Sequence, residues 1–204
     1  VNCGQTCIAP DYIVVNNHVK DELISMLKKN IISTFGSTPI KSDSYGRIIN
    51  TNNLLRLKEN LINQNIEFGG KIDEKNLYVE PTLVIDPDVN SEIMKEEIFG
   101  PILPILSYEN ENDLEKILDA NPSPLAFYIF SKNQKFIDKL INSNKFGGCV
   151  VNDTLIHFVN SNLPFGGIGP SGMGAYRGKF SFDTFTHYKP VLEKKSMIDL
   201  PLRY

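Results

Sequence analysis

Short β-rich runs alternate with amphipathic helical stretches along most of the chain, and this alternation is typical of a parallel α/β sheet. The first β-rich run covers 12–15, and apolar residues then recur at near-helical spacing within 18–32, with acidic side chains in the first turn. The same reasoning predicts helices over 52–63, 112–120 and 134–141, and strands over 78–85, 102–107, 125–130 and 148–151. Three right-handed β-α-β crossovers would account for this order.

Beyond Asn152 the periodicity stops, and a glycine-rich stretch leads into 182–186, whose alternating residues predict an edge strand or an arm. Residues 167–172 match the G-x-G-x-x-G spacing of phosphate-binding loops. However, no strand precedes them, no helix follows them, and Pro170 removes one backbone donor. We therefore interpret this stretch as a tight glycine turn that lets the backbone pass close to a site.

Composition limits the classes to which the chain can belong. Its 204 residues suit one domain of ordinary size with a short appendage, and 41% hydrophobic with 22% charged residues excludes a disordered chain. With 21 basic and 24 acidic residues the net charge is -3, so we expect no nucleic acid partner and no attraction to an anionic membrane. No stretch is apolar enough to predict a membrane span. A small-molecule partner is favoured.

The three cysteines, Cys3, Cys7 and Cys149, form no C-x-x-C pair, which argues against a disulfide framework and against a zinc site. We therefore expect no metal and a reducing compartment, the cytoplasm. The chain begins with Val1 and has neither an initiator Met nor the pattern of a signal peptide. We expect it to be a fragment of a longer protein.

Cys7 follows Gly4 closely, and a cysteine just after a glycine-containing turn can have backbone N–H groups aimed at whatever forms on its sulfur. The thiolate is the reactive form of cysteine, so this position suits a nucleophile. The alternative for Cys7 is a buried structural thiol. The spacing alone leaves both interpretations open.

Three blocks of the sequence resemble the aldehyde dehydrogenase superfamily, in order and at approximately the family's spacing. Residues 4–7 (GQTC) resemble its G-Q-x-C signature, and 7–12 resemble its class 3, fatty-aldehyde-dehydrogenase-like branch. Residues 96–101 (EEIFGP) resemble its cofactor motif, and 163–174 resemble its late P-F-G-G…S-G-x-G block. The resemblance runs from Asn2 to about Tyr188. It implies an α/β fold with a parallel, doubly wound sheet flanked by helices, and a C-terminal β arm.

The resemblance also implies roles for individual residues. Cys7 matches the nucleophile that forms first a thiohemiacetal and then a thioester with the aldehyde, and its backbone N–H matches one oxyanion donor. Glu97 matches the glutamate that binds the nicotinamide ribose, and Phe99 the aromatic against the nicotinamide, so the implied cofactor is NAD or NADP. Phe165 matches an aromatic of the substrate channel, and Asn152 an asparagine that organises the catalytic loop by hydrogen bonds. Without the motif, Glu97 would be interpreted as a solvated helix-end carboxylate and Phe99 as a core residue.

The remaining cysteines and histidines match no catalytic position of the family. We interpret Cys3 as a small packing residue and Cys149, within an apolar strand, as a buried and inert thiol. His157 is interpreted as a loop or tunnel-wall residue, and His187 as part of the C-terminal arm.

In the family that the chain resembles, the dinucleotide-binding domain, the general-base glutamate and the asparagine of the oxyanion hole lie upstream of the nucleophile motif. We therefore expect 1–181 to be the catalytic domain, 182–204 to be an oligomerisation arm, and the fragment alone to be inactive. The resemblance also implies a homodimer that acts on medium or long aliphatic aldehydes or on aromatic ones. Contact with a membrane is expected only through a tail after Tyr204, if such a tail exists.

Two alternatives to this function stay open. The chain could be a non-catalytic association fragment, in which 182–191 pairs with the sheet edge of another subunit. It could also be a relative that transfers the acyl group to coenzyme A instead of to water.

Overall fold

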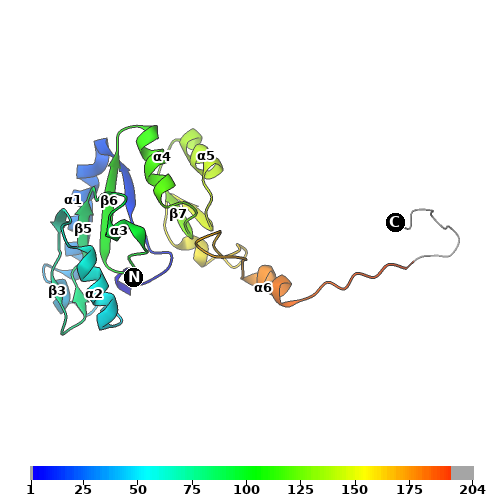
Figure 1. Ribbon diagram of the computed structural model, residues 1–204, viewed down its shortest axis with the longest axis horizontal. Helices are drawn as coiled ribbons and strands as arrows, with labels where there is room; N and C mark the ends of the chain where they lie inside the picture. Colours follow the sequence, from blue (N-terminus) through cyan, green and yellow to red (C-terminus); the bar gives the residue numbers. More distant parts are fainter. Residues whose placement is uncertain (1, 194–204) are drawn as a thin grey trace.

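The structure is a computed structural model that describes residues 2–193 (Figure 1). Its strands are β1 Ile13–Asn16, β2 Ile66–Phe68, β3 Ile72–Asp73, β4 Tyr78–Val79, β5 Thr82–Ile85, β6 Ile102–Tyr108, β7 Ala126–Ile129 and β8 Gly148–Val151. Its α-helices are α1 Lys20–Phe35, α2 Thr51–Asn60, α3 Glu92–Lys95, α4 Glu111–Ala120, α5 Gln134–Ser143 and α6 Gly178–Phe185. The described residues also form short 3-10 helices at Asn2–Gly4, Asn17–Val19, Pro39–Lys41 and Ile156–Phe158. No helix within residues 2–193 combines the length and the apolar character that crossing a membrane requires.

The main sheet has the strand order β1-β6-β5-β2. β6 pairs in parallel with both β1 and β5, and β2 lies antiparallel to β5 at the far edge. β7 and β8, which α5 connects, form a second parallel pair, and β3 with β4 forms a separate antiparallel pair. The expected parallel-rich α/β fold is confirmed, with one antiparallel strand on the main sheet.

Helices cover both faces of the main sheet, because each strand directs successive side chains to opposite faces. On one face, Leu83 and Ile105 pack against Ile24 of α1. On the other face, Val84 and Leu106 belong to a buried cluster that includes side chains of α2 and α3. This is the doubly wound arrangement that the resemblance implies.

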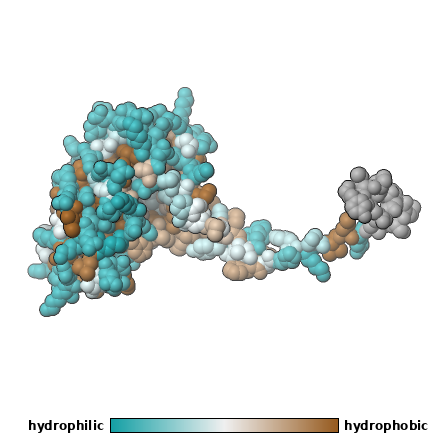
Figure 2. Space-filling view, in the orientation of Figure 1, coloured by the Kyte–Doolittle hydropathy of each residue, from teal (hydrophilic) through white to brown (hydrophobic). Residues whose placement is uncertain are grey.

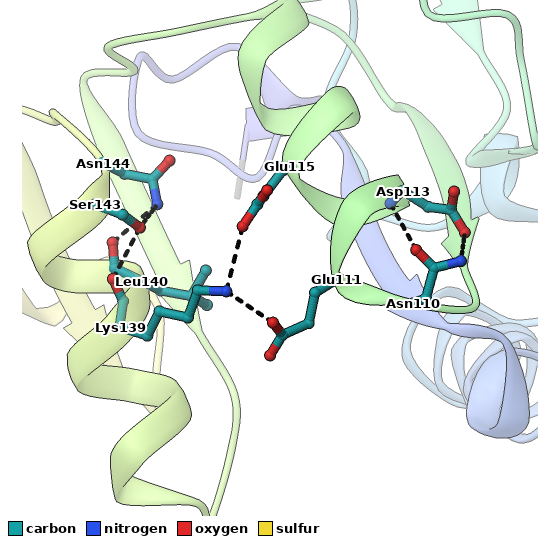
Figure 3. Close-up of polar contacts among 8 residues, drawn as sticks. All are labelled: Asn110, Glu111, Asp113, Glu115, Lys139, Leu140, Ser143 and Asn144. Carbon is teal, nitrogen blue, oxygen red and sulfur yellow. Dashed lines mark hydrogen bonds and ion pairs between the residues drawn. The ribbon is translucent and has the colours of Figure 1, made fainter.

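Helices α4 and α5 pack together beside β7 and β8. The buried side chains of this cluster are Leu114, Ile129, Ile137 and Leu140. Asn110 caps α4 by accepting a hydrogen bond from the Asp113 N–H at 3.1 Å, a common use of asparagine at this position. Lys139 of α5 reaches across to Glu111 at 2.8 Å and to Glu115 at 3.2 Å (Figure 3). These ion pairs are exposed, so the apolar cluster beneath them holds the two helices together.

The predicted strand 78–85 is in fact two strands, β4 and β5, which belong to different sheets. Pro81 lies at the break between them and lacks the N–H that a continuous ladder would use. Thr82 then starts β5 by donating its N–H to the carbonyl of Pro101 at 2.9 Å. The apolar run does form β structure, but the proline ends one strand, and the chain then enters the next sheet.

The predicted β strand at 182–186, and with it the C-terminal β arm, is wrong over the described residues, because 182–185 form the second half of α6. Helical contacts decide the conformation: Lys179 and Asp183 form an i,i+4 ion pair, and the Thr184 hydroxyl donates to the Phe180 carbonyl at 2.8 Å. Residues 186–193 form neither helix nor strand, and the rest of the expected arm, 194–204, lies outside the described residues. In Figure 1, α6 extends away from the folded body.

Candidate active site

Cys7 lies in a tight turn that comes shortly before β1. The Thr6 N–H donates to the Gly4 carbonyl at 2.8 Å, and the Ala9 N–H donates to the Thr6 carbonyl at 2.8 Å. The Cys7 N–H has no acceptor among residues 2–193, and the Cys7 side chain is exposed, which contradicts the buried-thiol alternative. The turn therefore presents a thiol together with a free backbone donor. Nucleophilic attack on a carbonyl needs this combination, because the sulfur attacks the carbon and the N–H stabilises the oxyanion that forms.

Gln5 fastens this turn to the segment before α2. Its Nε2 donates to the Arg47 carbonyl at 2.9 Å and to the Asn2 carbonyl at 3.1 Å, and its Oε1 accepts from the Ile49 N–H at 2.9 Å. A glutamine suits this position because it supplies a donor and an acceptor at once, which an ionised glutamate does not. Cys3 of the same turn is buried, as expected for a packing residue, and burial raises the pKa of its thiol.

The 96–101 segment contacts the Cys7 turn directly. Gly4 has φ +74°, and a Cβ on it would lie 2.2 Å from the Gly100 carbonyl oxygen, so both the conformation and the close approach require glycine. Next to this contact, Asp11 Oδ1 accepts from the Ile98 N–H at 2.9 Å, across 87 residues of sequence. Burial raises the pKa of the Asp11 carboxyl, although this hydrogen bond opposes the rise. The 4–7 block and the 96–101 block, which resemble two motifs of the family, thus lie side by side.

Glu97 and Phe99 lie between α3 and β6, on the exposed part of this segment. Arg56 of α2 holds the backbone here, because its guanidinium donates to the Glu97 carbonyl at 3.2 Å and to the Ile98 carbonyl at 2.6 Å. Partial desolvation raises the pKa of Glu97, and the nearby Asp11 carboxylate adds to the rise. Phe99 is 37% exposed and has φ +48°, which contradicts the core alternative for it. A non-glycine residue in this conformation is held there by its surroundings, and such residues cluster at functional sites.

Phe165 lies in a cluster of aromatic rings that the loop after β8 builds. Its ring centroid is 5.2 Å from that of Phe158, 5.6 Å from that of Tyr176 and 6.2 Å from that of His157. The Arg177 guanidinium stacks over the Phe158 ring at 3.8 Å. We call the set of five side chains the aromatic loop: His157, Phe158, Phe165, Tyr176 and Arg177. It provides an apolar surface with one cation on it.

His157 packs inside the aromatic loop and is only 8% exposed. Neither of its ring nitrogens has a hydrogen-bond partner within the described part of the chain. Burial lowers the pKa of His157 and the neighbouring Arg177 lowers it further, which favours the neutral imidazole. A Cβ on Gly148 would lie 2.9 Å from His157 Cδ2, so the ring packs closely against β8. On β8, Cys149 is half-buried rather than buried, and burial raises its pKa.

Asn152 joins the ends of β7 and β8. Its N–H donates to the Ile129 carbonyl at 2.8 Å, its Oδ1 accepts from the Ser131 N–H at 2.9 Å, and its Nδ2 donates to the Ser131 carbonyl at 3.0 Å. Its φ of +60° is one that asparagine tolerates better than most residues. Within residues 2–193 these hydrogen bonds tie the end of β8 to the end of β7, and none of them reaches the Cys7 turn.

Tyr128 of β7 connects this side of the structure to the Cys7 turn. Its phenol donates to the Ile8 carbonyl at 2.6 Å, and its ring lies 6.0 Å from that of His157. No local sequence pattern marks Tyr128 or Arg56, because both act on residues far away in the chain. Asp11 could have been found, since it belongs to the block that resembles the class 3 branch.

Residues 167–172 form the tight turn expected from the sequence. The Gly172 N–H donates to the Gly169 carbonyl at 3.2 Å, and the Ile168 N–H donates to Ser171 Oγ at 2.9 Å. Backbone donors that a phosphate would need are therefore used inside the turn. Over the same described residues, no three His, Cys, Asp or Glu side chains gather as metal ligands would.

Comparison with known proteins agrees with the three sequence blocks. A family model described as "Aldehyde dehydrogenase family" matches residues 1–191. The 4,4'-diaponeurosporen-aldehyde dehydrogenase of Staphylococcus aureus is 47% identical over 200 residues, which are 97% of this chain and 44% of that protein. Aldehyde dehydrogenase family 3 member A2 of Rattus norvegicus is 47% identical over 194 residues, which are 95% of this chain and 40% of that protein. The chain thus spans less than half the length of these relatives.

Solved structures agree on the fold. The substrate-bound state of Staphylococcus aureus AldH has a TM-score of 0.89 at 46% identity, and the match covers 97% of this chain and 44% of that one. The Staphylococcus aureus betaine aldehyde dehydrogenase in complex with NAD+ has a TM-score of 0.76 at 26% identity, covering 90% of this chain and 38% of that one. The chain therefore belongs to the aldehyde dehydrogenase family, in its class 3 branch.

Proposed function

We propose that residues 1–181 are the catalytic part of an NAD(P)-dependent aldehyde dehydrogenase and that Cys7 is its nucleophile. The observation that carries this proposal is the geometry of the Cys7 turn. An exposed thiol and a free N–H are held by Gln5 and by the close approach of Gly4 to Gly100, next to the segment that carries Glu97. A structural thiol needs none of these features.

The chemistry of the turn begins with the Cys7 thiolate, whose sulfur forms a bond to the aldehyde carbon while the carbonyl π electrons move to oxygen. The free Cys7 N–H donates to this oxygen and stabilises the charge that develops there. Oxidation of the thiohemiacetal leaves an acyl group on the sulfur as a thioester. Water then attacks the acyl carbon, and the C–S bond breaks with its electrons returning to sulfur, which releases the carboxylic acid, the Cys7 thiolate and one proton of the water to solvent.

The 96–101 segment has side chains that fit a nicotinamide cofactor. The exposed Glu97 carboxylate can accept hydrogen bonds from sugar hydroxyls, and the exposed Phe99 ring offers an apolar face to the nicotinamide. When bound, NAD or NADP supplies the acceptor for the two electrons of the oxidation. The NAD+ complex of the betaine aldehyde dehydrogenase supports this choice of cofactor. Because this chain spans 44% of the length of its relative, we expect the 204 residues alone to oxidise no aldehyde.

The aromatic loop favours an apolar substrate. The rings of Phe165, Phe158 and Tyr176 offer mostly apolar surface, which suits medium or long aliphatic aldehydes and aromatic ones. The name of the diaponeurosporen-aldehyde dehydrogenase supports an aldehyde substrate. Asn152 contributes by fixing the strand ends from which the loop starts. The three free cysteines suit the reducing cytoplasm.

The test replaces Cys7 in the intact enzyme that contains this chain. Cys7→Ser should lower kcat for NAD(P)-linked aldehyde oxidation by at least about a thousandfold, and the parent enzyme, quenched during turnover, should carry an acyl group on Cys7 by mass spectrometry. Cys149→Ser is the matched control and should keep its kcat, since that thiol is half-buried on β8. Oxidation that persists in Cys7→Ser would overturn the proposal. Product analysis with coenzyme A present separates release of the acid from release of an acyl thioester.

Association of two copies is a second role, and α6 favours it. Phe182 and Phe185 of this helix are 65% and 87% exposed. Figure 2 shows apolar surface on the part of this segment next to the largely hydrophilic body, interrupted by hydrophilic surface further out. Apolar side chains that gather on a protein surface mark interaction sites. Sedimentation of the parent and of Phe185→Ser tests this role: a dimer that dissociates in the variant supports it, and a dimer that persists unchanged contradicts it.

A further inference from the structure

Tyr128 makes a hydrogen bond that the proposed chemistry does not yet use. Its phenol donates to the Ile8 carbonyl at 2.6 Å, and Ile8 directly follows Cys7. Ile8 is 4% exposed, so water does not readily replace this donor. Within residues 2–193, no other hydrogen bond joins residues 7–9 to a distant part of the chain. The Ala9 N–H donates to Thr6, inside the turn itself.

The Tyr128 ring is itself held in place. Burial raises the pKa of Tyr128, a hydrogen bond with the Leu155 backbone opposes the rise, and the neighbouring Cys7 adds to it, so the phenol keeps its proton at neutral pH and remains a donor. The ring meets His157 at an interplanar angle of 62°, an edge-to-face arrangement. Leu155 has φ +66°, a strained conformation for a leucine. Tyr128 therefore packs against His157 of the aromatic loop and binds the Cys7 turn as well.

The other attachments of the turn reach different parts of the structure. Gln5 binds it to the segment before α2, and Asp11 binds the chain after it to Ile98. Neither reaches the aromatic loop. A small displacement of a reacting group lowers the rate strongly, so an attachment at Ile8, the residue that follows Cys7, bears on catalysis.

We propose that Tyr128 is a positioning residue for the nucleophile: its phenol fixes the Cys7 turn against the aromatic loop, so that the sulfur faces an aldehyde held there. This inference rests on the proposed function of Cys7. It does not assign Tyr128 a contact with the substrate, because its proton is committed to the Ile8 carbonyl.

Tyr128→Phe in the intact enzyme tests the proposal, because it removes the hydroxyl and keeps the ring. We expect kcat per active site, counted by titration of Cys7, to fall at least about tenfold, with the KM for aldehyde and for the cofactor unchanged. Amide hydrogen exchange at Ala9, whose N–H donates to the Thr6 carbonyl, should become about tenfold faster. The matched control is Tyr108→Phe, since Tyr108 packs beside α4 and α5 and its phenol makes no hydrogen bond within the described residues.

The outcomes separate the two proposals. If the parent enzyme is active and Tyr128→Phe keeps its kcat per active site, the role of Tyr128 is overturned. Unchanged slow exchange of the Ala9 amide in the variant overturns it too. The rate per total protein can also fall because less of the variant is folded. If the rate per titrated Cys7 then equals that of the parent, the role of Tyr128 is overturned as well. A parent enzyme that oxidises no aldehyde contradicts the proposed function, and the exchange measurement, which needs no substrate, then still decides whether Tyr128 fixes the turn.

Discussion

Replacing Gly4 by alanine should displace the Cys7 turn, because this glycine meets two constraints at once. Gly4 has φ +74°, and a Cβ on it would lie 2.2 Å from the carbonyl oxygen and 2.8 Å from the carbonyl carbon of Gly100. The conformation costs a residue with a side chain about 1–3 kcal/mol, and the overlap adds about 1–3 kcal/mol. The free energy of unfolding should therefore fall by about 2–6 kcal/mol in Gly4→Ala.

Gly36→Ala separates the two costs. Gly36 follows α1, has φ +76°, and has no atom within 4 Å of the position of its Cβ. This variant bears the conformational cost alone, about 1–3 kcal/mol, and the entropy that alanine removes from the unfolded chain is common to both variants. Urea unfolding of the parent and of both variants measures the difference. If Gly4→Ala costs no more than Gly36→Ala, the approach of the Cys7 turn to Gly100 does not constrain the site, and the reasoning is refuted.

Two further substitutions test the electrostatics. Because burial raises the pKa of Asp11, the folded state binds this proton more tightly than the unfolded state, so stability should fall as the pH rises from about 4 through the folded pKa and stay constant above it. In urea unfolding at several pH values, the free energy of unfolding of Asp11→Asn should rise relative to that of the parent as the pH increases over that range. A difference between the two proteins that does not depend on pH contradicts this. Lys139→Ala should cost less than about 1 kcal/mol, because its partners Glu111 and Glu115 are exposed. A loss above about 2 kcal/mol in the same assay would show that the pair is not screened by solvent.

The central helices could be predicted because their apolar periodicity and their caps agree. Asn50, Asn110 and Asn133 each accept a hydrogen bond from a backbone N–H in the first turn of the helix that follows, α2, α4 and α5 respectively. Helix α6 has no such cap, and its sequence alternates like a strand over 182–186. With five residues the two periodicities are hard to tell apart, so contacts within the helix decide the conformation.

The members of the candidate site could be predicted, but not what holds them. Cys7, Glu97 and Phe99 lie within short motifs that resemble a known family. Their supports are Arg56 on α2 and Tyr128 on β7, which act through backbone carbonyls far away in the sequence. A hydrogen bond to a backbone carbonyl requires no particular residue at the receiving position, and therefore it leaves no pattern there.

The parallel pairing of β1 with β6 explains why the candidate site lies where it does. The Cys7 turn precedes β1 and the 96–101 segment precedes β6, and segments before neighbouring parallel strands meet at the same edge of the sheet. Open α/β sheets more often bind ligands at the opposite, carboxyl edge. There, Asp86 accepts from the Ser107 N–H at 2.7 Å and from Lys20 at 2.8 Å, so these groups are paired within the protein. The Cys7 N–H has no such partner in the described chain, so under the proposed function the amino edge supplies the free donor that a developing charge needs.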